Sequence, residues 1–466
     1  MEQASGNFET TSVARTAAGA RTCARRLAQR YAALTLAQIG EQSRTAMKRL
    51  LMDYLGVALA GSRSESGLIA RRFAREHGGK SQARLIGDSA RVPMTAAAFA
   101  NAISSHSIEL DDIDVLALFH FSPPVFSSAL AAAEYTGANG KQLLTALAAG
   151  CEMMERASKA ANNSLRNRGF HTTPTCGVFG ATVAAAKLLR LSPDRLTSAL
   201  GLAGAQASGL MEMYGPSMQK RFNPGPTARN GVTAALMAQL GFTGTDTIFE
   251  GERGFLKAFA DRTQPDHLVA NLEAPYELLI EFKPYSCARP IHNAIDCALD
   301  IRNREGFDAD LIDSIHVARH PDWARYHQNK APRTYHEAQV SLPFSVAVAL
   351  LEGNALLEQY SNRNIRSASV KHLSQLTSIS EDATLPRGVS CKMTFKLRGG
   401  ELLTSQVDHP KGSIQNPMTD QEMRAKFESL AGPVIGTKRA GALADAVMEL
   451  EKVSDVSALL KMTAVR

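Results

Sequence analysis

The stretch Cys391-Lys392-Met393-Thr394-Phe395-Lys396-Leu397, with the turn Arg398-Gly399-Gly400-Glu401 after it, decides the fold class of this chain. Its apolar residues alternate strictly with polar ones, which is the period of a strand that buries one face. The paired glycines favour a tight turn, and Leu403–Val407 supplies the returning strand. The stretch therefore predicts a β-hairpin in a chain whose other parts are mostly helical in pattern.

The segments before this hairpin extend it into a mixed module. Leu311–Ala318 places isoleucine and valine among polar residues, which predicts a further strand. Pro290–Arg304 and Ser341–Gly353 have helical patterns. The pattern of the sequence changes from purely helical to mixed near Phe282, and it returns to helical after His409-Pro410. The intervening residues are therefore predicted to form an α+β module.

The sequence before this module is predicted to be almost purely helical. Apolar residues recur at three- and four-residue spacing from Met47 to Leu59, which gives one apolar stripe. Ser192-Pro193-Asp194 is typical of a helix start, with an N-cap serine, a first-turn proline and an acid. Leu200–Leu210 is rich in alanine and glycine, a composition that suits closely approaching helices. Gly241–Gly244 is expected to end a helix that runs from about Thr227 to Leu240.

Helical patterns resume after the module, where Thr419 and Glu422 form a capping-box pattern. This C-terminal segment is too short for an independent domain, so it is expected to pack on the first helical part. We therefore predict a mainly α protein, with a large all-helical domain built from N- and C-terminal segments and a smaller α+β insertion. The predicted parts are a disordered tail (1–22), the helical domain (23–280), the inserted α+β domain (281–409) and the C-terminal helices that complete the helical domain (410–466).

Composition and charge exclude several classes of protein. The 466 residues carry a net charge of +7, and the basic residues are scattered among acids without a run of like charge. This pattern disfavours nucleic-acid binding. A basic balance can draw small anions towards a cleft, or it can belong to an ordinary solvated surface.

The sequence also gives expectations about compartment and metals. The six cysteines are far apart and form no CxxC pair, which predicts free thiols and no metal cluster. The first residues lack the apolar segment of a secretory signal, and Glu2 and Glu9 disfavour a transit peptide. No run reaches 18 apolar residues, so a membrane span is not expected. We predict a cytoplasmic protein.

Chemistry-bearing side chains gather in four stretches, while Walker, GxGxxG, HExxH and GxSxG motifs are absent. The first, Ser105–Asp112, holds His106 and three carboxylates and continues to Phe119-His120-Phe121-Ser122. Grouped carboxylates raise one another's pKa, which suits a general acid or base near neutral pH. The alternative is a solvated helix end with an N-cap acid.

The second stretch is Gly169–Gly177, which precedes the alanine-rich segment Ala181–Leu189. Its His171 and the two threonines after it could hold an anion against the free N–H groups of a helix start. Alternatively, Thr172 or Thr173 only caps the helix and the histidine packs.

The last two stretches carry cations. Gly215–Gly225 places adjacent cations in a loop that opens a helix, either as a carboxylate clamp or as a common basic surface loop. Phe282–His292 carries Lys283, Arg289 and His292 at a helix start, where the helix dipole would lower their pKa and attract anions. The alternative there is an ordinary basic helix start.

Taken together, these stretches resemble the MmgE/PrpD family, which includes 2-methylcitrate dehydratases, cis-aconitate decarboxylases and an iminodisuccinate epimerase. The resemblance covers nearly the whole chain beyond residue 25, in the same order. The stretches that carry it are Met52–Gly56, Ile108–Asp112, Gly169–Leu191, Lys220–Gly231, Gly241–Phe259, Phe282–His292, Ser341–Phe344 and His409–Gly412.

The resemblance implies a homodimer in which the helical domain and a smaller α+β lid enclose the active site between them. It implies an enzyme of a small polycarboxylate that uses no metal and no cofactor. Residue by residue, it assigns catalytic roles to His120, His171, Lys220 and Lys283. The residues that it assigns to substrate binding are Glu109, Asp112, Arg289, His292 and Phe344.

Some positions depart from the aconitate decarboxylases of the family. Those enzymes carry Asp in place of Glu109, a polar Thr or Tyr in place of Ile113, and in some cases a Tyr near Phe344. His120 lies between two phenylalanines, so we expect apolar surroundings and a lowered pKa, which suit a neutral base.

The leading hypothesis is a cofactor-independent lyase that dehydrates a 2-methylcitrate- or citrate-like acid or decarboxylates an aconitate-like acid. Cations would stabilise an aci-carboxylate, and the two histidines would exchange protons with the substrate, with the base and the acid not assigned. One alternative is a dicarboxylate epimerase or isomerase that returns the proton. The other is a non-catalytic carboxylate-binding protein on the same fold.

Overall fold

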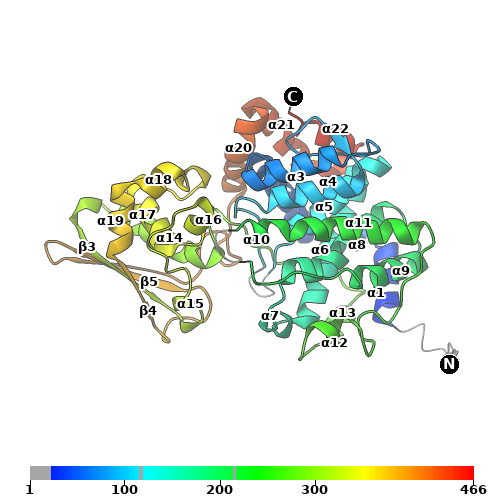
Figure 1. Ribbon diagram of the computed structural model, residues 1–466, viewed down its shortest axis with the longest axis horizontal. Helices are drawn as coiled ribbons and strands as arrows, with labels where there is room; N and C mark the ends of the chain where they lie inside the picture. Colours follow the sequence, from blue (N-terminus) through cyan, green and yellow to red (C-terminus); the bar gives the residue numbers. More distant parts are fainter. Residues whose placement is uncertain (1–21, 115–118, 214–216, 466) are drawn as a thin grey trace, which may run out of the picture.

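The computed structural model describes residues 22–114, 119–213 and 217–465, and the predicted tail lies almost wholly outside these ranges. Most of the described chain is helical (Figure 1). A large core includes α2 (Glu41–Gly61), whose predicted apolar stripe from Met47 to Leu59 is buried. The mainly α fold class is thus confirmed. No helix in these ranges is both long enough and apolar enough to span a bilayer.

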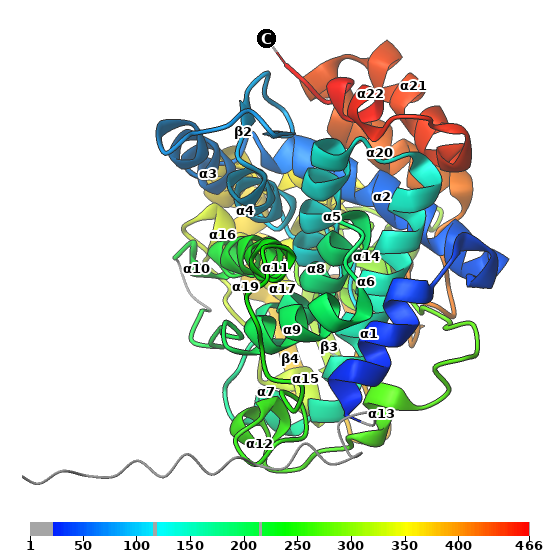
Figure 2. The ribbon, with the colours of Figure 1, turned by 90° about the vertical axis from the view of Figure 1, so that its right-hand side faces the viewer.

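The other helices of this large core come from both ends of the chain. The C-terminal helices α20 and α21 pack against α2, and Figure 2 shows α20 next to α2. The N-terminal part consists of α1 (Cys23–Ala33), α3 (Glu65–Glu76), the short strands β1 (Ala83–Arg84) and β2 (Arg91–Val92), α4 (Met94–Ser105), α5 (Ser122–Thr136), α6 (Gly140–Ala161), α7 (Ser164–Asn167), α8 (Thr172–Leu188), α9 (Pro193–Gly204), α10 (Gln219–Phe222), α11 (Pro224–Gln239), α12 (Phe255–Phe259) and α13 (Asp266–Val269). The C-terminal part consists of α20 (Asp420–Ile435), α21 (Thr437–Met448) and α22 (Val456–Lys461).

The centre of this core is α8, which packs against α5, α6, α9 and α11 (Figure 2). Small residues allow this close approach: a Cβ atom added at Gly180 would lie 2.6 Å from the carbonyl oxygen of Gly150 in α6. The prediction of close packing for Leu200–Leu210 is confirmed only for its first part, where a Cβ atom at Gly201 would lie 2.5 Å from the carbonyl oxygen of Thr245. Helix α9 ends at Gly204, and Leu210 is exposed. Because α8 crosses the middle of the core, the residues at its N-terminus, including His171 at the N-cap position, are held in a fixed place.

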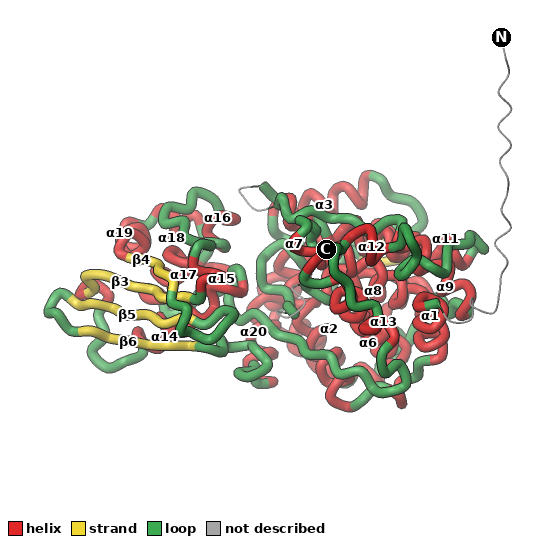
Figure 3. Tube along the Cα trace, turned by 90° about the horizontal axis from the view of Figure 1, so that it is seen from below, coloured by secondary structure: helices red, strands yellow, loops and turns green. Residues whose placement is uncertain are grey.

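The predicted hairpin is confirmed, with β5 (Cys391–Leu397) paired antiparallel to β6 (Leu402–Val407). The predicted strand before it is β3 (Ile312–Arg319), which pairs antiparallel with β5. A fourth strand, β4 (Thr377–Glu381), pairs parallel with β3 and was not predicted. Figure 3 shows the resulting sheet, in the order β4-β3-β5-β6, at one end of the molecule.

A second hydrophobic core lies between this sheet and its helices, and it draws on residues from Cys287 to Phe395. The first core ends at Phe282 along the chain and resumes at Met418, so the two cores share no residue. The exact domain boundaries at 281 and 409 stay a prediction. The helices of the second core are α14 (His292–Arg302), α15 (Pro321–Ala324), α16 (Tyr335–Gln339), α17 (Leu342–Glu352), α18 (Asn362–Arg366) and α19 (Ala368–Leu376).

Helix boundaries test the local predictions. Ser192 caps α9 and Thr419 forms a capping box with Glu422, as predicted. Gly241, in the left-handed region at φ 103°, follows α11 as expected of a helix stop. The predicted start of α8 is wrong, because the helix begins at Thr172 and both Thr172 and Thr173 lie inside its first turn. The N-cap position belongs to His171, whose side chain does not cap the helix.

Candidate active site

A cavity of about 350 Å³ lies between the two cores and receives side chains from both. Of the residues predicted to form the site, Glu109, His120, His171, Lys220, Lys283 and Arg289 line it, and Asp112, His292 and Phe344 do not. Further lining residues include Ile113, Arg166, Met213, Trp323, His327, Arg387, His409 and Ile414.

The backbone after α4 turns one of the three grouped carboxylates, that of Glu109, towards the cavity. Glu109 has a φ of 56°, which is uncommon for a residue other than glycine. Ile108 and Leu110 on either side of it are buried in a small apolar cluster with residues of α2 and α20. The apolar neighbours therefore anchor the turn, and the carboxylate of Glu109 is left on its other side.

Glu109 is the centre of a buried cluster of cations. Its Oε1 accepts hydrogen bonds from Lys220 and Arg221 of α10, and its Oε2 lies 3.2 Å from Lys283 Nζ. Burial alone would raise the pKa of Glu109, but the three cations hold it well below its usual value. Burial lowers the pKa of Lys220 to about 8, although Glu109 opposes the shift.

Lys283 reaches this cluster because residues 113 and 281 form an antiparallel bridge, with N···O distances of 2.9 and 3.0 Å. Burial would lower the pKa of Lys283, but Glu109 and Asp111 raise it above its ordinary value. The predicted lowering by a helix start is therefore wrong for Lys283. Two carboxylates close to the amine outweigh any helix dipole.

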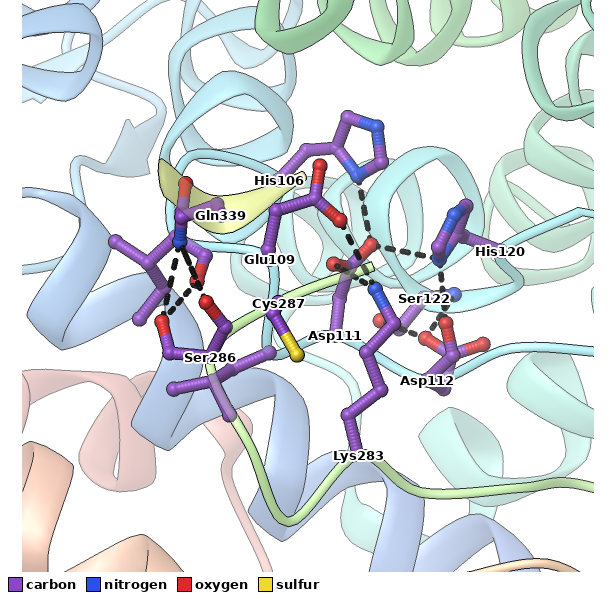
Figure 4. Close-up of polar contacts among 12 residues, drawn as sticks. His106, Glu109, Asp111, Asp112, His120, Ser122, Lys283, Ser286, Cys287 and Gln339 are labelled. Atoms are coloured by element: carbon purple, nitrogen blue, oxygen red, sulfur yellow. Dashed lines mark hydrogen bonds and ion pairs between the residues drawn. The ribbon is translucent and has the colours of Figure 1, made fainter. Parts of the chain in front are cut away.

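Asp111 joins two imidazoles (Figure 4). Its Oδ2 lies 2.6 Å from His106 Nδ1 and 3.0 Å from His120 Nδ1. Although burial would raise the pKa of Asp111, His120, His106 and Lys283 lower it far below its ordinary value. Asp111 is thus a carboxylate that orients both rings.

These three residues are also the group with metal-ligand geometry among the described residues, since their ligand atoms lie within 4.8 Å of one another. The same atoms already bond to each other through the two short contacts above. The hydrogen bonds account for their approach, and an ion held by this group would have to replace both of them.

Asp112 has a different place from its neighbour. Its carboxylate accepts hydrogen bonds from the backbone N–H groups of Phe121 and Ser122 at the start of α5, at 2.7 and 3.1 Å. The Ser122 hydroxyl donates to it at 2.5 Å. Asp112 therefore stabilises the start of α5 and lies outside the cavity lining. It is fully buried, so the alternative of a solvated helix end is wrong here.

The imidazole of His120 has polar partners. Its Nδ1 lies 2.5 Å from the carbonyl oxygen of Asp112, in addition to the Asp111 carboxylate. Phe119 and Phe121 are buried in the large core instead. The prediction of apolar surroundings for this ring is therefore wrong, because the flanking side chains point into the core.

The hydrogen bonds assign opposite protonation to the two catalytic candidates. Both neighbours of His120 Nδ1 are acceptors, so Nδ1 carries a proton and Nε2 of the neutral ring has the lone pair. His171 Nδ1 lies 3.0 Å from the Asn223 amide nitrogen, which donates to it, so the neutral ring carries its proton on Nε2. The Asn223 amide nitrogen also faces the Met213 sulfur at 3.2 Å, as a donor should.

Burial is the largest cause that lowers the pKa of His171 far below its usual value, and nearby His106, His120, Lys220 and Arg166 add to it. His171 is therefore neutral at pH 7. Neither Nε2 atom has a hydrogen-bond partner among the described residues, and both rings line the cavity. A lone pair and an N–H group thus face the same space.

The remaining candidates are placed away from this pair of rings. Arg289 reaches the cavity wall, but its guanidinium is paired with Glu281 at 2.8 Å. His292 is buried behind it and contacts Arg289 and the carbonyl oxygen of Cys287. Phe344 lies in the second core and packs against Tyr360.

Several residues of the site were not predicted. Asp111 and Arg221 lie next to predicted residues, so their stretches were identified but not the side chains themselves. Asn223 and His106 orient or accompany the rings through contacts described above. Gln339 joins α16 to the cation cluster, since its side-chain oxygen accepts from Arg221 at 3.1 Å and its amide donates to the carbonyl of Ile108. No local pattern marks a single glutamine of this kind.

Comparison with known proteins identifies relatives over most of the chain. The family model described as MmgE/PrpD N-terminal domain matches residues 25–268, and that described as MmgE/PrpD C-terminal domain matches residues 285–452. The cis-aconitate decarboxylase-like protein oryM of Aspergillus oryzae is 31% identical, over 81% of this chain and 84% of its own length. The cis-aconitate decarboxylase of Aspergillus terreus is 28% identical over 81% and 83%. The Mus musculus enzyme of that name is 27% identical over 80% and 79%.

Proposed function

Because this chain belongs to the MmgE/PrpD family, we propose that it is a lyase that acts on a small aconitate- or citrate-like acid without a cofactor. The relatives named as cis-aconitate decarboxylases support an aconitate-like substrate. The observation that carries the proposal is the pair of imidazoles with opposite protonation, which open into one cavity together with Lys220 and Lys283.

In this proposal, Lys220 and Lys283 hold the carboxylate next to the reacting carbon. Each amine gives a hydrogen bond to Glu109 and has further N–H donors for a ligand. When electrons move onto that carboxylate, it becomes a dianionic aci-carboxylate. Preorganised cations in a water-poor site stabilise such developing charge more than any other group of the site.

His120 is the group that carries the proton. Its Nε2 lone pair faces the cavity, while Asp111 lies behind Nδ1 and stabilises the positive charge that the ring gains with a second proton. His120 is thus the base, and Asp111 is the carboxylate that orients it. A positioned acid or base of this kind contributes about 10²–10⁴-fold to the rate.

His171 acts as a neutral hydrogen-bond donor. Its lowered pKa keeps it uncharged, and Asn223 keeps the proton on Nε2. A neutral imidazole can stabilise a developing oxyanion or a departing hydroxyl without first losing a proton. The two rings therefore have different tasks, and the base is assigned to His120.

The same groups support two lyase reactions. In decarboxylation, the bond between carbon and the leaving carboxylate breaks, CO₂ departs, and the electron pair moves to the carboxylate held by the lysines. For this reaction His120 first takes a proton from water at Nε2, then gives it to the carbon and returns to its neutral form. In dehydration, neutral His120 removes the α-proton, a C=C bond forms, and the hydroxide leaves beside the His171 N–H group.

The test is ¹H NMR of the purified protein in D₂O with cis-aconitate, trans-aconitate, citrate and 2-methylcitrate, each incubated separately. We expect one acid to be consumed, either with loss of CO₂ and deuterium at the carbon that is protonated, or with loss of water. Deuterium exchange without loss of either group would instead establish the epimerase or isomerase. Binding without any exchange or conversion would establish a non-catalytic binder.

We further propose that the active form is a homodimer. Ile69 and Phe73 of α3 and Phe222 of α10 are about half exposed, and Phe73 and Phe222 both pack on Phe99 with ring centroids 5.6 and 5.9 Å away. A contiguous exposed apolar patch on a helical surface is typical of a protein interface. Light scattering should give twice the chain mass, and Phe73→Glu with Phe222→Glu should halve it. A wild-type monomer would contradict this proposal.

A further inference from the structure

The Lys and Arg side chains that line the cavity differ in whether they have a carboxylate partner. Lys220 and Lys283 are paired with Glu109, Arg289 with Glu281, and Arg387 with Asp322. Arg166 makes no side-chain hydrogen bond and no ion pair with any residue that the structure describes. It is therefore the one lining Lys or Arg in those ranges whose charge is left for a ligand.

The position of Arg166 is set by its short helix. It lies in α7, on the segment between the two long helices α6 and α8, and its side chain is half-buried. Figure 1 places α7, like α10 with Lys220, on the side of the large helical part that faces the sheet. The charge of Arg166 acts on His171, which is five residues further along the chain, by lowering its pKa.

A half-buried guanidinium without a partner is unusual, because desolvation of a cation is unfavourable unless an anion compensates for it. Its planar donors match a carboxylate in two parallel hydrogen bonds. The cations around Glu109 are partly neutralised by that residue and by Asp111, so they offer little charge for a second anionic group.

We propose that Arg166 binds a substrate carboxylate other than the one held by Lys220 and Lys283. This inference rests on the proposed function and extends it by assigning a residue to the carboxylate on the side arm of such an acid. The natural ligand is then a tricarboxylate, and the corresponding acid with a methyl group in place of the carboxymethyl arm binds more weakly.

Two unreactive analogues separate this role from general charge attraction. Propane-1,2,3-tricarboxylate has the third carboxylate on a carboxymethyl arm. In 2-methylsuccinate a methyl group replaces that whole arm. Isothermal titration calorimetry would measure both on the wild type, on Arg166→Gln and on Arg168→Gln. Arg168 is a matched control, since it lies two residues away, outside the cavity lining, and pairs with Asp261 at 3.5 Å.

We expect Arg166→Gln to weaken tricarboxylate binding by roughly 10- to 100-fold, as for the loss of a charged hydrogen-bonded pair. Binding of 2-methylsuccinate should stay within about threefold, and Arg168→Gln should change neither affinity. An equal loss for both analogues in Arg166→Gln, an equal loss in Arg168→Gln, or no binding of the tricarboxylate to the wild type would overturn the inference.

The melting temperature of each variant reports whether the fold is intact. If Arg166→Gln fails to fold, Arg166→Lys provides the comparison, because it keeps the charge and loses the paired hydrogen bonds. The wild type could show no turnover in the NMR test but still bind the tricarboxylate selectively through Arg166. That result would refute the lyase and would still support this carboxylate site.

Discussion

The two walls of the cavity are built in different ways. On the side of the large helical core, Glu109, His120 and His171 are buried and each is held by at least one polar partner. On the side of the sheet, the lining includes α15 and loops around residues 386–389 and 413–415, in addition to the buried Lys283 and Arg289. There Arg387 has 84% of its side chain exposed.

This difference indicates which wall carries the proton transfer and which wall encloses the substrate. A buried polar network has no water to replace a missing partner, so each of its groups is tightly constrained in position and protonation. Exposed loop residues exchange their partners for water at little cost. We therefore infer that proton transfer depends on the helical wall, while the wall on the sheet side closes the space around the substrate.

The largest expected effect tests the helical wall directly. His120→Ala should reduce kcat by about 10²–10⁴-fold, because it removes the positioned acid–base group, and His171→Ala should fall in the same range. His409→Ala removes an imidazole from the opposite wall and serves as the control, with kcat within about threefold of the wild type. Steady-state kinetics on the acid identified by NMR measure all three. Near-normal turnover in both helical-wall variants would refute the mechanism.

The second prediction compares the stability of the two walls. Glu109→Gln leaves Lys220, Arg221 and Lys283 without their shared carboxylate, which should lower the free energy of unfolding by about 3–5 kcal/mol. Asp322→Asn breaks the exposed pair with Arg387 and should cost less than about 1 kcal/mol. Urea unfolding followed by circular dichroism gives both values. Similar losses in the two variants would mean that the walls do not differ in this respect.

The third prediction concerns pH. The amine of Lys220 is charged below its pKa of about 8 and neutral above it, so carboxylate binding should weaken as the pH rises through that value. KM should increase by up to roughly tenfold per pH unit above 8. Lys220→Arg keeps its charge over this range and should remove the dependence. A KM of the wild type that is constant from pH 7 to 9.5 would contradict the role of Lys220.

The smallest effect is expected on the wall formed by the sheet side. Arg387→Gln should change kcat/KM by less than about threefold, because its pair with Asp322 is exposed and contributes little. The measurement is the same kinetic assay, with Arg166→Gln as the cavity-lining arginine that should respond. A loss above about tenfold in Arg387→Gln would make this wall part of substrate binding.

Local patterns predicted much of the architecture. The apolar stripe of α2, the caps of α9 and α20 and the hairpin of β5 and β6 depend on residues within one element, so the sequence contains the whole cause. β4 was missed because its short segment, Thr377–Glu381, is largely polar and pairs with β3 more than 60 positions earlier. Its strand character comes from the neighbour, as is usual for β structure.

Neighbouring residues of the site show the same limit of prediction from local sequence. Asp111 and Asp112 are adjacent and chemically identical, yet one orients two imidazoles and the other caps α5. Lys220 and Lys283 were identified from their stretches, while their convergence on Glu109 depends on the turn after α4 and the bridge between residues 113 and 281. The side chain of Phe344 belongs to the second core, which its position in a helix start did not reveal.

By itself, the sequence determined the helical class, the place of β3, β5 and β6, and the stretches that supply carboxylates, imidazoles and cations. Only the tertiary structure decided which carboxylate meets which cation, which nitrogen of each histidine carries the proton, and which arginine lacks a partner. The physical reason is distance along the chain. Helix periods and caps arise between residues a few positions apart, whereas pKa values and protonation depend on groups from remote segments that are buried together.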